Sequence, residues 1–261
     1  MNSLMGIFDT HAHYDDVKFN ENRNEVLSSM KVNGVSYICN VGSDLKSSET
    51  SIELANNYEF IYSAVGVHPE CVDNLPADWL NQIENLAEQN KVVAIGEIGL
   101  DYHYPDFSKK KQFDVFEKQL DLAQNLNKPV IIHSRDAVED TISILNNFPK
   151  VSGVIHCFSG SAEVACRYIE MGWYLGFTGV VTFKNAKKAV EAVGAIPVEK
   201  LVLETDCPYM APEPWRGHCC NSKMLVSVAN KIAEIKEMLP QEIVDITRNN
   251  AFNLYRIDVS K

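Results

Sequence analysis

The sequence of 261 residues has no run of about 18 apolar residues, the length that a membrane-spanning helix needs. It contains only 13 glycines and 10 prolines, too few for a collagen-like or low-complexity chain. Hydrophobic residues make up 46% of the chain and supply enough apolar surface for a core, which argues against intrinsic disorder. The sequence therefore predicts a folded protein without a membrane span.

An excess of positive charge is also missing. The 24 lysines and arginines are outnumbered by 35 aspartates and glutamates, which gives a formal net charge of −11 at pH 7. Proteins that coat nucleic acid by broad neutralisation of phosphates carry the opposite sign, so that class is excluded. A nucleic-acid enzyme remains compatible with this charge if local cations, including bound metal ions, neutralise the phosphates.

The cysteines lack the pattern of a disulfide framework. There are seven of them, an odd number, scattered along a chain of ordinary size. Residues 1–6 show no basic segment followed by an apolar one, as a secretion signal would. These features predict reduced thiols and a cytoplasmic protein. The adjacent pair Cys219 and Cys220 lacks the two-residue gap of a zinc knuckle, so it gives little support for a metal site.

Short β-branched runs alternate with longer amphipathic segments along the whole chain. The predicted strands are 6–13, 35–41, 61–67, 92–98, 129–133, 153–157, 173–178 and 200–206. The predicted helices are 21–32, 47–57, 76–89, 108–126, 138–146, 162–171, 186–193, 222–238 and 240–252. This alternation predicts a parallel sheet covered by helices.

Two architectures can hold such a sheet, a doubly wound open sheet or a TIM-type (β/α)8 barrel. Eight predicted strands favour the barrel, which needs about 250 residues. The first strand is followed by Tyr14, Asp15 and Asp16 instead of the glycine-rich phosphate turn of a dinucleotide-binding fold. We therefore predict an α/β protein with a TIM-type barrel and one domain over residues 1–261. With no exposed apolar heptad or orphan edge strand, a monomer is expected.

Side chains that can bind metal gather at the carboxyl ends of these strands, where barrel enzymes build their sites. Residues two apart in a strand point to the same side, so His11 and His13 project together. The full set of strand-end candidates is His11, His13, Glu97, His133, His156 and Asp206. Each alone has an ordinary explanation, such as a hydrogen-bonded histidine or a helix-capping aspartate. Together they would form a costly buried polar cluster unless they bind metal.

The composition of this set also indicates how many ions it holds. Six imidazole and carboxylate ligands exceed the needs of one tetrahedral ion and suit two divalent ions that share a carboxylate. Since none of the six is a thiolate, zinc, manganese and magnesium all remain open. The residues alone therefore predict a metal-dependent hydrolase.

The chain resembles the TatD family of metal-dependent hydrolases, the TatD deoxyribonucleases, within the amidohydrolase-like barrels. The resemblance runs along essentially the whole chain and rests on several motifs in order. They are Asp9–Thr10–His11–Ala12–His13, Gly66–Val67–His68–Pro69, Gly96–Glu97–Ile98–Gly99–Leu100–Asp101–Tyr102, His133–Ser134–Arg135, His156–Cys157–Phe158–Ser159–Gly160, Glu204–Thr205–Asp206–Cys207–Pro208–Tyr209 and Arg216–Gly217.

The resemblance implies the ligand set. His11, His13 and Asp206 would hold the first metal, and Glu97 would bridge to a second metal held by His133 and His156. Similar enzymes are phosphodiesterases that trim DNA from its 3′ end, with RNA as a further substrate, so single-stranded DNA or another nucleic-acid 3′ end is the expected partner.

One loop departs from the family pattern. Many members carry an Arg-Gly-Lys-Arg stretch after the last strand, whereas this chain reads Arg216–Gly217–His218–Cys219–Cys220. Two expected cations are thus replaced by a histidine and a cysteine. If the loop grips phosphates, it does so more weakly here, or it grips something else.

The expected catalytic residues are Asp206 and Glu97. Asp206 is the candidate general base, which would take a proton from the attacking water and pass it to the leaving oxygen. Its alternative is a plain ligand without a proton role. Glu204 is a candidate for orienting a ligating imidazole, or else a core carboxylate paired inside the barrel wall.

Three more residues are candidates for binding substrate. Arg135 and Arg216 carry guanidinium groups that match phosphate oxygens, with a surface ion pair as the alternative for each. His68 could donate to a substrate phosphate, or could make a structural hydrogen bond beside Pro69. Asp101 and Tyr102 are expected to shape the loop over the site.

Two other functions remain open. Barrels with this ligand pattern resemble amidohydrolases, lactonases and phosphotriesterases, and the acidic composition would suit a small or neutral substrate. No lysine lies at a strand end to carry the bridging carbamate common in those relatives, and Glu97 takes that place. A non-enzymatic barrel that uses metal only for structure or binds a partner protein is the third possibility.

Overall fold

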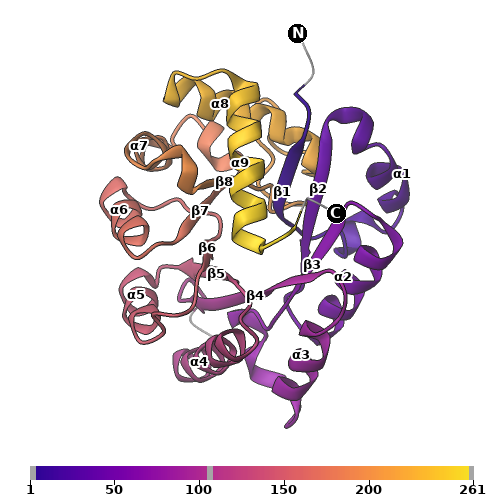
Figure 1. Ribbon diagram of the computed structural model, residues 1–261, viewed down its shortest axis with the longest axis vertical. Helices are drawn as coiled ribbons and strands as arrows, with labels where there is room; N and C mark the ends of the chain where they lie inside the picture. Colours follow the sequence, from indigo (N-terminus) through magenta and orange to yellow (C-terminus); the bar gives the residue numbers. More distant parts are fainter. Residues whose placement is uncertain (1–3, 105–107, 259–261) are drawn as a thin grey trace. The chain divides into compact units, whose positions relative to one another are not determined.

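The computed structural model describes residues 4–104 and 108–258, in which strands and helices alternate along the chain (Figure 1). The eight strands follow one another in the sheet in sequence order, from β1 to β8. Every strand pair with a described register is parallel. This order of parallel strands with intervening helices is that of the (β/α)8 barrel class, so the predicted fold class is confirmed.

Each predicted strand and helix corresponds to an observed one. The strands are β1 Ile7–Ala12, β2 Val35–Val41, β3 Ile61–Val65, β4 Val92–Asp101, β5 Val130–Arg135, β6 Gly153–Ile155, β7 Tyr174–Phe177 and β8 Leu201–Leu203. The helices are α1 Arg23–Ser28, α2 Leu45–Asn57, α3 Trp79–Ala87, α4 Lys109–Asn125, α5 Val138–Asn146, α6 Ala162–Glu170, α7 Lys187–Ala195, α8 Leu225–Lys236 and α9 Pro240–Tyr255.

Two boundaries differ from the prediction in ways that matter for the site. Strand β4 continues three residues beyond the predicted end at Ile98, so Asp101 is its buried last residue and not part of a loop. The helix expected over 222–238 begins instead with the short 3₁₀ helix η6, Ser222–Met224, before α8. Asn221 caps η6 by accepting a hydrogen bond from the Lys223 backbone N–H, which fixes the place of the turn.

The chain forms two compact units, which are described separately. The first unit comprises residues 1–40, 157–253 and 257–261, and the second comprises residues 41–156 and 254–256. The prediction that residues 1–261 make a single domain stays a prediction, and its two ends lie outside the described residues.

Strands β1, β7 and β8 of the first unit are almost entirely buried. An aromatic cluster anchors helix α9 here, with the Phe252 ring centroid 5.6 Å from that of Phe8 and 5.0 Å from that of Tyr37. Such edge-to-face contacts add to the apolar area that the rings bury. The first unit thus holds β1, which carries His11 and ends directly before His13, against a packed core.

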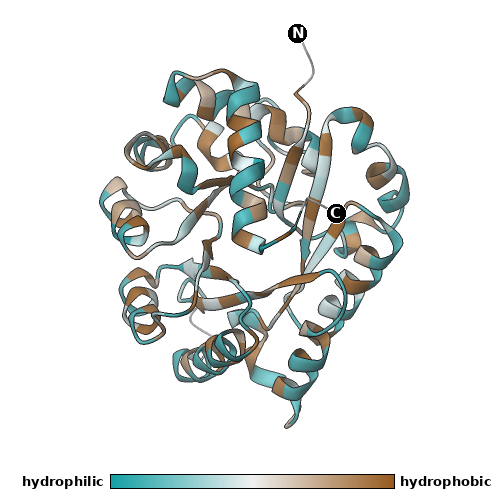
Figure 2. Cartoon of the chain, in the orientation of Figure 1, coloured by the Kyte–Doolittle hydropathy of each residue, from teal (hydrophilic) through white to brown (hydrophobic). Residues whose placement is uncertain are grey.

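In the second unit, β3 pairs with β4, β4 with β5 and β5 with β6. Helix α4 packs on β4 through an apolar face, on which Phe116, Leu120 and Ala123 are buried. Full burial of each large side chain contributes about 1.5–3 kcal/mol. Figure 2 shows both hydrophobic and hydrophilic colours on the helices, as expected for elements with one face on a sheet.

Among the helices of the described residues, none is long and apolar enough to cross a membrane.

Candidate metal-binding residues

Three predicted ligands meet in the first unit, and we call His11, His13 and Asp206 the β1–β8 group. The Nε2 atoms of His11 and His13 lie 3.0 Å apart. Asp206 Oδ1 lies 3.4 Å from His13 Nε2 and 3.9 Å from His11 Nε2. Two imidazole nitrogens and a carboxylate oxygen that converge in this way have the spacing and the chemistry of ligands to one divalent ion.

Backbone hydrogen bonds hold the two strand ends of this group together. Asp206 N–H donates to the carbonyl of His11, and His13 N–H donates to the carbonyl of Cys207, each at 2.9 Å. Asp206 itself adopts a left-handed conformation with φ of 57°, which aspartate tolerates better than most residues. The turn after β8 therefore directs the Asp206 side chain toward the two histidines.

A buried polar network lies beside the β1–β8 group. The Asp9 carboxylate accepts hydrogen bonds from the Thr205 backbone and hydroxyl groups and from the Ser222 hydroxyl. The Ser222 oxygen lies 2.8 Å from the Tyr14 hydroxyl, which accepts the Ser222 backbone N–H. Burial raises the pKa of Asp9 to about 7, although these hydrogen bonds favour the charged form. The network joins β1, the residues after β8 and η6, and sequence reasoning did not predict it.

Glu204 lies in the first unit directly after β8 and is buried. Its Oε1 accepts a hydrogen bond from the backbone N–H of Cys157 at 2.5 Å. Gly176 leaves the space that its carboxylate fills, because a Cβ at that position would lie 2.2 Å from Oε2. The predicted role of Glu204 in orienting an imidazole stays a prediction.

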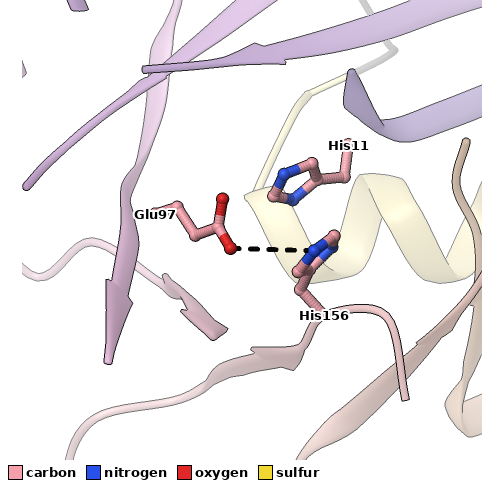
Figure 3. Close-up of side chains that lie close together, drawn as sticks. All are labelled: His11, Glu97 and His156. Atoms are coloured by element: carbon pink, nitrogen blue, oxygen red, sulfur yellow. Dashed lines mark ion pairs between the residues drawn. The ribbon is translucent and has the colours of Figure 1, made fainter. Parts of the chain in front are cut away.

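The second unit brings together a different set around Glu97, and we call His68, Glu97, His133 and His156 the Glu97 group. Glu97 Oε1 lies 2.8 Å from His133 Nδ1, 3.6 Å from His68 Nε2 and 3.7 Å from His156 Nε2. Figure 3 shows the ion pair between Glu97 and His156. One carboxylate oxygen thus faces three imidazoles, two of which, His133 and His156, were predicted to be ligands.

Both ring nitrogens of His133 face carboxylates. Nδ1 contacts Glu97, and Nε2 lies 2.9 Å from Asp101 Oδ2. Burial by itself would lower the pKa of His133, but the hydrogen bonds and charges of Asp101 and Glu97 outweigh it and raise that pKa to about 9. The two carboxylates therefore stabilise the imidazolium form.

Sequence reasoning missed Asp101 as a neighbour of the ligands. The predicted strand ends at Ile98, whereas parallel pairing of β4 with β5 in the structure places Gly99 beside His133 and Asp101 beside Arg135. Extension of the predicted strand by three residues would have put the Asp101 side chain at the same strand end as His133.

Hydrogen bonding indicates the tautomer of His68. Its Nδ1 accepts the backbone N–H of Glu70 at 3.2 Å, so a neutral ring carries its proton on Nε2. The Nε2–H group then faces Glu97 Oε1. This arrangement suits a hydrogen-bond donor, and the roles predicted for His68 stay predictions.

Two buried glutamines of α4 hold the strand ends that carry these groups. Gln119 accepts the backbone N–H of Val67 and donates to the carbonyl of the same residue. Gln112 does the same for Asp101, with distances of 2.9 and 2.8 Å. Because the two glutamines are seven residues apart, they lie on one face of the helix. Helix α4 thereby fixes the residues next to His68 and His133.

The two predicted phosphate-binding arginines are both exposed. The Arg135 guanidinium lies 5.4 Å from the ring centroid of Tyr104, and that of Arg216 lies 3.8 Å from the ring centroid of Phe183. An aromatic face orients each guanidinium without occupying its N–H donors. Their role in binding substrate stays a prediction.

The two cysteines of the loop that departs from the family pattern, residues 216–220, do not form a thiolate metal site. Cys219 is exposed, whereas Cys220 is buried, and burial raises the pKa of the Cys220 thiol far above its usual value. A thiol that is hard to deprotonate is a poor metal ligand. The imidazole and carboxylate groups of the two units fit divalent zinc, manganese or magnesium.

Comparison with known proteins agrees with this chemistry. Residues 8–256 match the family model described as TatD related DNase. The metal-dependent hydrolase YabD of Bacillus subtilis is 44% identical over 97% of this chain and 100% of its own length. The metal-dependent hydrolase YcfH of Escherichia coli K12 is 34% identical over 98% of each chain.

Solved structures show the same similarity. The crystal structure of YjjV, a TatD homolog from Escherichia coli K12, superposes with a TM-score of 0.91 and 29% identity over 97% of this chain and 98% of that chain. A TatD family hydrolase from Entamoeba histolytica superposes with a TM-score of 0.88 and 26% identity, over 97% and 99% of the two chains.

Proposed function

The chain belongs to the family of TatD-related DNases and is a metal-dependent hydrolase of that family, and from this premise we propose that it hydrolyses phosphodiester bonds at the 3′ end of DNA with the help of two divalent ions. The observation that carries the proposal is the convergence of His11, His13 and Asp206 within 4 Å of one another. Such a site prepares water for attack on an ester and is not needed to stabilise a barrel that has an apolar core.

The ligands of the first ion would be His11, His13 and Asp206, and those of the second ion would include Glu97, His133 and His156. When bound, divalent ions lower the pKa of a coordinated water toward about 7 and stabilise the charge that develops on the phosphate oxygens. The expectation from the family resemblance that Glu97 bridges the two ions stays a prediction.

Asp206 is the residue that we assign to proton transfer. It follows β8, its side chain is 15% exposed, and its Oδ1 faces the two histidines. A carboxylate in that position accepts a proton from the attacking water and returns it to the leaving oxygen. His11 and His13 hold fixed positions on the buried strand end and are better suited to stay as ligands.

Binding of the DNA backbone would fall to exposed or partly exposed donors. Arg135 at the end of β5 and Arg216 in the loop after β8 offer guanidinium forks to phosphate oxygens. His68 offers its Nε2–H group beside Glu97. These local donors would supply positive charge that the acidic composition of the chain as a whole does not.

Metal restoration tests the proposal directly. Protein stripped of metal is incubated with single-stranded DNA labelled at its 5′ end, and magnesium, manganese or zinc is added back separately. A ladder of progressively shorter labelled products that depends on the added ion supports the 3′ exonuclease and identifies the effective metal. Cleavage that needs no ion, or no cleavage with any ion, contradicts the proposal.

The net charge of −11 favours a second candidate, a hydrolase of small or neutral esters, lactones or amides. A panel of such substrates, assayed with the same restored metals, separates the two. Turnover of a lactone or an amide, without shortening of DNA, would select the small-substrate hydrolase.

A further inference from the structure

We propose that Asp101 is a positioning residue, which holds the Nε2–H group of His133 so that His133 presents its Nδ1 atom to the metal ion of the Glu97 group. The inference rests on the proposed metal site and goes beyond the predicted ligand set, in which Asp101 has no part.

The two ring nitrogens of His133 face opposite sides of the Glu97 group. Nδ1 faces Glu97 Oε1, the same oxygen that His68 and His156 approach. Nε2 points the other way and meets Asp101 Oδ2 at 2.9 Å. Metal binding would displace the proton that Nδ1 shares with Glu97, and the carboxylate of Asp101 keeps the remaining proton of the neutral imidazole on Nε2. The lone pair is then on Nδ1, the nitrogen that faces the other candidate ligands.

Hydrogen bonds hold both the side chain and the backbone of Asp101 in place. Its Oδ1 accepts the backbone N–H of His103 at 2.8 Å, while its Oδ2 contacts His133. Gln112 binds its backbone N–H and carbonyl groups, and the residue is buried at the end of β4. A carboxylate fixed at both oxygens and along its backbone can hold an imidazole in one orientation, as carboxylates behind metal-bound histidines commonly do.

The same contacts argue against Asp101 as a ligand of the ion. Each of its oxygens already accepts a hydrogen bond from a protein N–H group, and Oδ2 lies on the Nε2 side of the imidazole. To reach an ion at Nδ1, the side chain would have to give up both hydrogen bonds.

The chemistry of Asp101 makes a sharp test possible with a nearly isosteric change. Both carboxylate oxygens face N–H donors, but the side chain of the Asp101→Asn variant has one oxygen and one NH₂ group. Since the His103 backbone N–H is always a donor, the amide oxygen faces it and the NH₂ group faces His133 Nε2. That contact favours a proton on Nδ1, which blocks metal binding at this nitrogen.

The experiment measures binding of zinc alone to protein stripped of metal, by isothermal titration calorimetry. Wild type is expected to bind two ions per chain, and Asp101→Asn is expected to bind one of them about 10–100-fold more weakly. The matched control is Asp140→Asn, which also replaces a carboxylate by an amide. Asp140 accepts a hydrogen bond from the hydroxyl group of Tyr102, the residue that follows Asp101. Equal affinities in the variant and the control, or a wild type that binds no zinc at the Glu97 group, would overturn the proposal.

A second measurement separates positioning from a general effect on folding. In ¹⁵N-detected spectra of zinc-loaded wild type, His133 should show a protonated Nε2 and a metal-shifted Nδ1. The thermal midpoints of the metal-free Asp101→Asn and Asp140→Asn variants provide the folding control. A proton on Nδ1 of wild-type His133, with zinc at Nε2, would contradict the proposal.

Neither measurement uses DNA, so failure of this inference and failure of the proposed function can be distinguished. Loss of one zinc ion in Asp101→Asn, together with a wild type that does not shorten DNA, would leave the positioning role intact and remove DNA as the substrate. Normal zinc binding by Asp101→Asn, together with a wild type that shortens DNA, would remove the positioning role and leave the proposed function intact.

Discussion

The β1–β8 group and the Glu97 group contain similar ligand types but differ in how their side chains are held. In the β1–β8 group, backbone hydrogen bonds between strand ends and a buried network of Asp9, Thr205, Ser222 and Tyr14 support the ligands. In the Glu97 group, carboxylates contact the imidazoles directly, and glutamine amides from α4 hold the strand ends.

The difference shows two ways to keep polar side chains fixed beside the ends of buried strands. Buried polar groups must be satisfied, or each costs about 1–3 kcal/mol. The first unit meets this demand with hydroxyl groups that lie beside the ligands, whereas the second unit meets it with side chains of a covering helix. Substitutions in the two supports should therefore have different consequences for stability and for metal binding.

The largest effect is expected from the ligands themselves. His11→Ala removes one of two converging imidazoles from the β1–β8 group and should lower kcat/KM on single-stranded DNA by about 1000-fold or more, because the proposed catalytic ion would lose a ligand. The measurement is the rate of shortening of 5′-labelled DNA, with metal content determined in parallel. His103→Ala, which truncates an exposed histidine, is the control. Wild-type activity in His11→Ala would show that the reaction does not depend on this group.

The next effect concerns the support of the Glu97 group. Gln112→Ala leaves the buried N–H and carbonyl groups of Asp101 without their side-chain partner and should lower the free energy of unfolding by about 2–4 kcal/mol. Urea denaturation measures the change. Gln124→Ala on the same helix is the matched control, because the Gln124 side chain makes no hydrogen bond within the described residues. A Gln112 variant as stable as the control would mean that α4 does not hold this strand end.

The strand-end histidines and Gln112 also differ in how far the sequence predicted their positions. The alternation of strands and helices predicted the fold class, and the period of a strand predicted that His11 and His13 project together. The grouping of both with Asp206 followed from the family resemblance. Gln112 could not be found in the same way. A glutamine on an amphipathic helix looks like a surface residue, and only the packing of α4 on β4 brings it to Asp101.

Asp101 was missed for a related reason. The residues Gly99 and Leu100 before it are not β-branched, and the predicted strand ends at the last β-branched residue, Ile98. Pairing with β5 overrides this local preference and extends β4 to Asp101. The gathering of side chains at the strand ends was thus predictable from the barrel topology, whereas the length of β4 and the contacts made by α4 were not.

A smaller effect is expected in the support of the β1–β8 group. Ser222→Ala removes the hydroxyl group that donates to Asp9 and contacts Tyr14, and should lower the free energy of unfolding by about 1–3 kcal/mol. Only a side-chain hydroxyl is lost, and the Thr205 contacts to Asp9 remain. Thermal or urea denaturation, with Ser227→Ala on α8 as the control, measures it. If Ser222→Ala lowers the free energy of unfolding more than Gln112→Ala does, the hydroxyl network stabilises the protein more than Gln112 does.

The smallest effect is expected outside both groups of ligands. Arg135 is exposed beside Tyr104, so Arg135→Ala should leave stability unchanged and raise KM for DNA by about 3–10-fold, or about 1 kcal/mol of binding. The effect should be larger for a phosphodiester than for a neutral ester, because only the phosphate carries the charge that a guanidinium recognises. Lys150→Ala, which removes an exposed positive charge from the same unit, controls for the change in net charge. If KM rises equally for both substrates, or equally in both variants, Arg135 does not bind phosphate.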